Sequence, residues 1–148
     1  MREKYYLDND WYFSEKWEAA QSNAEYDEAA MQSVRIPHTV KELPFHYFDE
    51  HAYQMVSGYR RHLLVKKEWE GKVVRLTFEG VAHDSEVFVN GKKAGAHHCG
   101  YTAFTIDISA LLYYGEDNII AVRVDSNENL NVPPFGFVID YMTYGGVP

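Results

Sequence analysis

The sequence has 148 residues, of which 46% are hydrophobic and 24% are charged, and its formal net charge is −8. A chain of this length forms one domain that buries roughly 68–70% of its unfolded surface. An acidic chain with no basic stripe argues against nucleic acid as a partner. No apolar run approaches the ~18 residues that cross a membrane. We therefore expect neither nucleic acid nor a membrane as a partner.

The single cysteine, Cys99, rules out an internal disulfide framework and fits a reducing compartment. Residues 1–5 carry no apolar stretch of a secretory signal, so we expect a cytoplasmic location. Aromatic residues reach 16% of the chain. Aromatic rings stack on the C–H faces of sugars, which makes this content compatible with carbohydrate recognition. They also pack well in β-sheets, which is the simpler explanation for any one ring.

The first half of the chain gives few strand signals. Residues 14–32 are rich in Ala and Glu and lack alternation, so they favour one or two short helical turns or an irregular excursion. Pro37 breaks strand pairing at Ile36-Pro37-His38, because proline has no N–H to donate. From Gly58 onward the apolar residues recur every second position. Leu63 and Val65 are expected to face the core.

The second half predicts strands separated by turns. Val74, Leu76 and Phe78 alternate with polar residues, which is typical of a strand buried on one face. Asn90-Gly91 after a β-branched run predicts a type I′ hairpin, because that turn needs a positive φ at both central residues. The remaining expected elements are a strand at 104–106, a helical turn at 108–112, a strand at 119–124, an extended turn at 132–136 and a polar aromatic loop at 140–146. One of the X-Pro bonds in the turn at 132–136 is a candidate for the cis form. Short strands with no long helical period between them predict an all-β, antiparallel sandwich or barrel.

Carboxylates are the first candidates for chemistry, because glycoside hydrolysis needs two of them about 5–9.5 Å apart. The candidates are Glu79, Asp84, Glu86, Asp107, Asp125, Glu128 and Asp140. Spacing does not show which of them meet, and most are expected to be structural or solvated. Asn127-Glu128 resembles the Asn-Glu pair that precedes the acid of many retaining glycosidases. Since it falls in a polar loop, we reject it as catalytic.

Histidines and Cys99 are weaker candidates. Seven histidines suggest a metal, but the neighbours His97 and His98 would point to opposite faces of a strand. His38, His46 and His51 lack the i, i+4 spacing of metal ligands on a helix, and no cysteine accompanies them as a further ligand. We therefore expect no metal site. Cys99 beside His98 resembles a nucleophile pair only superficially, and we expect a buried or half-buried thiol. No phosphate loop, nucleophile elbow or dinucleotide fingerprint is present, so we expect no cofactor.

A series of short motifs, spread from Trp11 to Gly146, is specific in its order and spacing. The motifs are Ile36-Pro37-His38-Thr39, Gly58-Tyr59-Arg60-Arg61, Leu76-Thr77-Phe78-Glu79-Gly80-Val81, Val87-Phe88-Val89-Asn90-Gly91-Lys92, Gly100-Tyr101-Thr102-Ala103-Phe104, Asp107-Ile108, Gly115-Glu116-Asp117-Asn118, Val122-Arg123-Val124-Asp125 and Tyr144-Gly145-Gly146. In these motifs the chain resembles the N-terminal sugar-binding domain of glycoside hydrolase family 2, the family of β-galactosidases and β-glucuronidases.

The resemblance implies a jelly-roll β-sandwich over residues 1–148 that packs beside a catalytic barrel of the same polypeptide. The acid/base and nucleophile of the family lie in that barrel, so it implies no catalytic residue here and an inactive isolated chain. The parent enzyme would be a retaining β-galactosidase that acts on a terminal β-glycoside. One residue of this domain reaches the family's active site, and Asp140 matches its position. The implied role of Asp140 is substrate binding, as an acceptor of hydrogen bonds from sugar hydroxyls.

Two other functions stay open from the residues alone: a free-standing carbohydrate-binding module, and a structural sandwich that mediates subunit contacts. The first needs an exposed row of aromatics, which the clearest strands do not show. The family normally follows the glycine pair with an Arg and a further strand, whereas this sequence has Val147-Pro148. We therefore expect an unprotected sheet edge that pairs with a second copy as a homo-oligomer.

Overall fold

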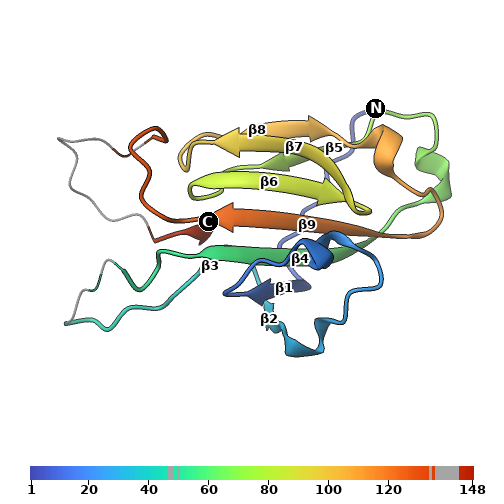
Figure 1. The fold of residues 1–148 in the computed structure, drawn as a ribbon. Helices are drawn as coiled ribbons and strands as arrows, with labels where there is room; N and C mark the ends of the chain where they lie inside the picture. The colour runs from blue at the N-terminus through green and yellow to red at the C-terminus, as the bar shows by residue number, and fades with distance from the viewer. Residues whose placement is uncertain (47–48, 50, 134, 136–143) are drawn as a thin grey trace.

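The fold is all-β, with four short 3-10 turns between the strands (Figure 1). The computed structural model describes residues 1–46, 49, 51–133, 135 and 144–148. The strands are β1 (Trp11–Ser14), β2 (Gln32–Val34), β3 (His38–Thr39), β4 (Val56–Leu64), β5 (Arg75–Phe78), β6 (Asp84–Val89), β7 (Lys92–His98), β8 (Phe104–Asp107), β9 (Asp117–Asp125) and β10 (Gly146–Val147). The turns are η1 (Ala19–Ser22), η2 (Glu28–Ala30), η3 (Lys67–Trp69) and η4 (Ser109–Leu111). Within this part of the chain, no helix is long and apolar enough to cross a membrane.

The strands form an antiparallel sandwich, as the sequence predicts. One layer is a six-stranded sheet in the order β2-β1-β4-β9-β6-β7, and two-stranded sheets β5-β8 and β10-β3 complete the fold. The core combines inward side chains of the large sheet with those of the small ones. Its buried members include Trp11, Phe13, Tyr59, Leu76, Phe78, Val87, Val89, Ile120, Val122, Val124 and Val147.

Alternate positions of the period-two pattern are buried and exposed, as the sequence predicts. In β5, Leu76 and Phe78 are buried while Arg75 and Thr77 are exposed. The β6–β7 hairpin is also confirmed: Val89 pairs with Lys92, and φ is 51° at Asn90 and 81° at Gly91. Positive φ at both central residues is the type I′ geometry.

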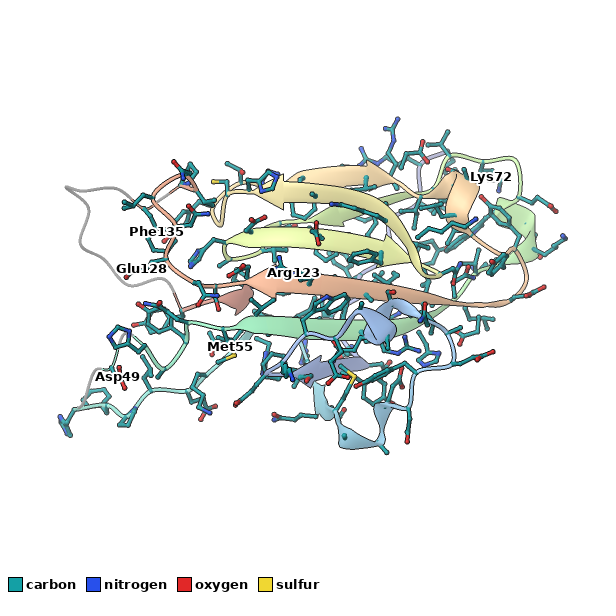
Figure 2. The ribbon with its side chains drawn as sticks, viewed as in Figure 1. Asp49, Met55, Lys72, Arg123, Glu128 and Phe135 are labelled. Carbon is teal, nitrogen blue, oxygen red and sulfur yellow. The ribbon has the colours of Figure 1, made fainter. Side chains whose placement is uncertain are left out.

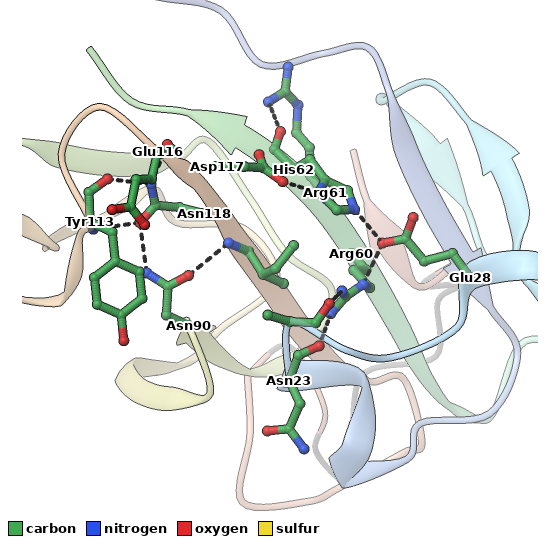
Figure 3. Close-up of polar contacts among 12 residues, drawn as sticks. Asn23, Glu28, Arg60, Arg61, His62, Asn90, Tyr113, Glu116, Asp117 and Asn118 are labelled. Atoms are coloured by element: carbon green, nitrogen blue, oxygen red, sulfur yellow. Dashed lines mark hydrogen bonds and ion pairs between the residues drawn. The ribbon is translucent and has the colours of Figure 1, made fainter. Parts of the chain in front are cut away.

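Residues 14–32 cross the outer face of the large sheet and form two short 3-10 turns, η1 and η2, which is one of the alternatives that the sequence left open. This segment covers β4 and β9, so β4 is buried on both faces at residues 57–60. The covered face includes Gly58 and Arg60, which period-two reasoning alone would place in solvent. The guanidinium of Arg60 is 1% exposed and bonds to the segment above it (Figure 3).

The structure tests one of the two X-Pro bonds that were candidates for the cis form. The cis X-Pro bond in the described part of the chain is Ile36–Pro37, and Val132–Pro133 is not cis. The second bond of the candidate pair involves residue 134, which lies outside the described residues.

Candidate functional site

One end of the sandwich gathers the long connections, and we call it the loop end. The register places Val56, Asp84, His98 and Asp125 together there, since Asp125 pairs with both Val56 and Asp84, and Asp84 pairs with His98. The connections before β4 and after β9 both project from this end, as the positions of Asp49, Met55, Glu128 and Phe135 show (Figure 2). Loops presented by a rigid scaffold are the usual place for binding residues.

The predicted substrate-binding residue, Asp140, belongs to the connection between β9 and β10 but lies outside the described residues. The flanks of this connection, the 126–144 segment, are held close together. A β-carbon at Gly145 would lie 2.6 Å from Cβ of Ser126 and 3.1 Å from the Val40 side chain, so only glycine fits there. Gly145 also has a φ of 67°, which glycine adopts without strain. The two ends of the segment therefore meet at one point, as in a compact surface loop.

Hydrogen bonds fix both ends of this segment. Ser126 is fully buried, and its hydroxyl donates to the carbonyl of Tyr53 at 2.6 Å. At the other end, Gly146 and Ala82 exchange two backbone bonds of 2.8 and 3.2 Å. The segment thus starts from the core of the sandwich and returns to it.

A small polar cavity of about 150 Å³ lies under the first part of the segment. Its lining residues are His83, Asp84, Asp125, Asn127, Glu128, Asn129 and Val132. Ligand pockets usually measure ~300–1,000 Å³, so this cavity is below the usual size of a ligand site. It is better suited to holding the segment than to holding the substrate.

Two of its carboxylates are committed to structural bonds. Asp125 accepts from the backbone N–H and the side-chain amide of Asn127, at 3.1 and 2.8 Å, and pairs with Arg123 at 3.2 Å. Asp84 lies 2.7 Å from Nδ1 of His98. These bonds shape the start of the segment, since an aspartate that bonds to the backbone two residues later forms a turn.

The most unusual group in the cavity is His83, which is 1% exposed. Among the described residues, neither of its ring nitrogens has a hydrogen-bond partner. Burial lowers the pKa of His83 to about 4, although the charge of Asp125 acts in the opposite direction. The imidazole is therefore neutral at pH 7 and makes an edge-on contact with Phe135, with ring centroids 4.7 Å apart.

The other predicted carboxylates serve the scaffold or solvent. Glu86 pairs with Lys93 at 2.5 Å, which lowers the pKa of Glu86. Asp107 accepts bonds from the N–H and hydroxyl of Ser109, at the start of η4, and Glu79 is exposed. The structure brings Asp84, Asp125 and Glu128 to one cavity, which spacing in the sequence did not reveal.

The histidine pair in β7 has divergent partners. His97 bonds to the Thr102 hydroxyl and stacks on Phe104, whereas His98 pairs with Asp84. Cys99 is half-buried as expected, and bonds from Tyr101 and Thr102 lower the pKa of its thiol. Throughout the described residues, no group of three His, Cys, Asp or Glu side chains is arranged to hold a metal.

Sequence analysis did not single out His83. The signal was available, because positions 83, 85, 87 and 89 share the inward face of β6 and its approach, and all four are buried. A histidine at an inward position of a period-two pattern is a buried polar group, and such groups normally have a hydrogen-bond partner.

Comparison with known proteins agrees with the fold and the motifs. Residues 8–141 match the family described as "Glycosyl hydrolases family 2, sugar binding domain". A β-galactosidase of Thermoanaerobacter pseudethanolicus is 44% identical over 124 residues, which are 83% of this chain and 17% of that protein. A β-galactosidase of Thermoanaerobacterium thermosulfurigenes is 38% identical over 148 residues, which are 99% of this chain and 20% of that protein.

β-Glucuronidases are similar as well. One from Bacteroides fragilis is 39% identical over 92 residues, which are 62% of this chain and 13% of that protein. The solved structure of a Bacteroides uniformis β-glucuronidase superimposes with a TM-score of 0.81 at 26% identity, over 95% of this chain and 16% of that one. The chain thus spans about a fifth or less of the length of these relatives. It belongs to the sugar-binding domain family of glycoside hydrolase family 2.

Proposed function

We propose that this chain is the sugar-binding domain of a retaining β-galactosidase, in which Asp140 accepts hydrogen bonds from the terminal sugar. The observation that carries the proposal is the closed base of the 126–144 segment at the loop end, where Ser126 and Gly145 touch. Loops presented by a rigid scaffold are the usual place for binding residues, and both ends of this segment are anchored in the core.

The choice of galactose is supported by the relatives. The proteins that are 44% and 38% identical over most of this chain are β-galactosidases. The β-glucuronidase that is 39% identical aligns over only 92 residues. The proposed substrate is therefore a terminal β-galactoside, with a β-glucuronide as the competing substrate.

Catalysis itself is assigned to a barrel of the same polypeptide. Hydrolysis requires two carboxylates that are free to act on the glycosidic bond. Asp84, Glu86, Asp107 and Asp125 already form short bonds with neighbouring side chains or backbone groups. This supports a non-catalytic role for the chain, with no turnover by the chain alone.

A free-standing carbohydrate-binding module is less well supported. The exposed aromatic side chains include Tyr5, Tyr6, Phe45, Tyr101, Tyr113 and Tyr144. They come from separate connecting segments rather than from alternate positions of one strand, so they do not suggest a flat stacking platform. We also propose that the protein forms a homo-oligomer, because the edge strands β2 and β7 can pair with a second copy. We propose that it is located in the reducing cytoplasm, which the single Cys99 supports.

The test is the kinetic preference of the full-length enzyme between aryl β-galactosides and aryl β-glucuronides. We expect kcat/KM to favour the galactoside by about two orders of magnitude or more. NMR of the first-formed sugar should show the β-anomer, because a covalent intermediate retains configuration. A preference for the glucuronide would overturn the substrate assignment, and an inverted product would overturn the mechanism.

A further inference from the structure

A histidine on the outer face of the large sheet has a carboxylate at each of its ring nitrogens. Nδ1 of His62 in β4 contacts Oδ2 of Asp117 at the start of β9, and Nε2 lies 2.9 Å from Oε1 of Glu28 in η2 (Figure 3). The ring therefore joins the sheet to residues 14–32, the covering segment. We propose that His62 is a pH-sensitive latch, which fastens the covering segment to the sheet when the ring is protonated and loosens it when the ring is neutral.

The two contacts need the protonated form of the ring. Both nitrogens of an imidazolium carry a hydrogen and donate, whereas a neutral imidazole donates from one nitrogen and accepts at the other. An ionised carboxylate can only accept. A neutral His62 would therefore set a lone pair against an oxygen of either Asp117 or Glu28. The bridge is complete in one protonation state only.

Loss of the proton weakens the bond to Glu28 whichever carboxylate the ring keeps. If the neutral ring donates to Asp117, the bond to Glu28 is lost. If it donates to Glu28, the bond remains but the attraction between two opposite charges is lost. The side chain of Asp117 is 50% exposed and that of Glu28 is 16% exposed, so water replaces the ring more readily at Asp117.

Arg60 is a permanent tether beside this latch. Its Nε lies 2.5 Å from the same Oε1 of Glu28, and its other guanidinium nitrogens donate to three backbone carbonyls of the covering segment. A guanidinium stays charged at every pH at which the protein is folded. Deprotonation of His62 should therefore loosen η2 locally, while Arg60 keeps the covering segment on the sheet.

Charged groups surround the ring from four directions. On β9, η2, β4 and the approach to β1, they are Asp117, Glu28, Arg60, Arg61 and Asp10. Burial lowers the pKa of His62, but the two bonded carboxylates outweigh it and the net pKa is raised. Arg61 donates to the backbone carbonyl of His62 at 2.7 Å, and the charge of Asp10 acts on Arg61. The latch is therefore fastened in mild acid and loosens as the pH rises past neutrality.

The experiment is NMR of the 148-residue chain at about pH 6 and about pH 8.5, a range in which an imidazole with a raised pKa loses its proton. Ring shifts follow the titration of His62. The Met31 amide reports on η2, because it donates to the carbonyl of Glu28 at 2.9 Å. We expect its protection against hydrogen exchange, corrected for the intrinsic effect of pH, to fall about fivefold as His62 deprotonates.

Two variants of the bridge separate the latch from a general effect of pH. In Asp117→Asn the neutral ring can accept from the new amide and still donate to Glu28, so protection at Met31 should stay high at both pH values. His62→Gln carries no charge, so protection should be low at both. Both replacements are close in size to the original side chain, and both sites are at least 44% exposed, so the chain should fold.

His98→Gln is the matched control. Nδ1 of His98 lies 2.7 Å from Oδ1 of Asp84, and in the described part of the chain its bond to a carboxylate is at this nitrogen alone. Its neutral form can keep that bond, so His98→Gln should show the same fall at Met31 as wild type.

Three results would overturn the latch. The first is protection at Met31 that stays within about twofold while His62 titrates, or a His62 that keeps one charge state over the range. The second is a fall in Asp117→Asn equal to that in wild type, because the paired carboxylates would then not be its cause. The third is a fall that persists in His62→Gln or disappears in His98→Gln, because another group would then be the switch.

Discussion

Arg60 of β4 and Glu28 of η2 form an ion pair of 2.5 Å across 32 residues of sequence. The same guanidinium donates to the carbonyls of Gln21, Asn23 and Ala24, at 2.6 to 3.1 Å (Figure 3). One buried side chain thus holds the segment that covers the outer face of the large sheet.

Replacing Arg60 should be strongly destabilising. Arg60→Met would leave three backbone carbonyls without their donor and Glu28 with His62 in place of the buried guanidinium, at a cost of about 3–5 kcal/mol in unfolding free energy. Urea denaturation of the chain measures this change. Arg35→Met, at an exposed position, should stay within about 0.5 kcal/mol of wild type. A loss below about 1 kcal/mol for Arg60→Met would show that the segment is held by its other contacts.

Gly58 provides the space in which this segment lies against β4. A β-carbon there would lie 2.0 Å from Oε1 of Gln21 and 3.0 Å from the Trp17 ring. Gly58→Ala should therefore cost about 1–3 kcal/mol through overpacking. Gln21→Ala in the same chain should recover part of the loss, which a double-mutant cycle by denaturation would detect. If Gly58→Ala is neutral, the segment shifts freely and the close packing is not required.

The hairpin turn should depend on glycine at position 91. Gly91→Val would place a β-branched residue at a φ of 81°, where its β-carbon would also lie 3.2 Å from Oδ1 of Asn23. We expect a loss of about 1–3 kcal/mol in unfolding free energy. Lys92→Val, one residue later in strand β7, should change it by about 0.5 kcal/mol or less. Equal effects of the two substitutions would contradict a turn-specific strain.

Stability should fall in mild acid because of His83. Its pKa is about 4 in the folded chain and 6.5 when unperturbed, so the unfolded chain binds more protons between these values. Unfolding free energy should drop by about 3 kcal/mol as the pH falls from 6.5 to 4. The burial-lowered pKa of His38 acts in the same direction. The pKa of His62 is raised, because Asp117 and Glu28 outweigh burial, and it acts in the opposite direction.

The difference between wild type and His83→Phe isolates the His83 contribution, since His38 and His62 titrate in both chains. In urea melts at pH 7, 6, 5 and 4, the unfolding free energy of wild type should fall relative to that of His83→Phe, by about 3 kcal/mol over the range. A constant difference across this range would show that His83 does not change its protonation on unfolding.

Asp140→Ala in the full-length enzyme should lower kcat/KM by about tenfold to a hundredfold. A hydrogen bond from a sugar hydroxyl to a carboxylate contributes about 1.5–3 kcal/mol. The pH profile should barely move, because the titrating pair is assigned to the barrel. Asp125→Ala is the comparison: it removes the bonds to Asn127 and should lower thermal stability. A change within about threefold for a stably folded Asp140→Ala would refute the binding role.

Strand positions and the hairpin could be predicted from local patterns. Leu76 and Phe78 are buried because alternation along a strand depends only on the chain itself. Asn90 and Gly91 adopt positive φ because their own covalent chemistry allows it. The order of motifs from Trp11 to Gly146 was likewise sufficient to identify the family, since it reflects the succession of strands and turns.

The burial of Arg60 and the surroundings of His83 were not accessible in this way. Arg60 lies on the outer face of β4, and only the path of residues 14–32 across that face removes it from water. The surroundings of His83 are made by Gly100 and Phe135, which approach it from different connections. Contacts between segments distant along the chain depend on how the layers close, and no spacing or local pattern encodes that closure.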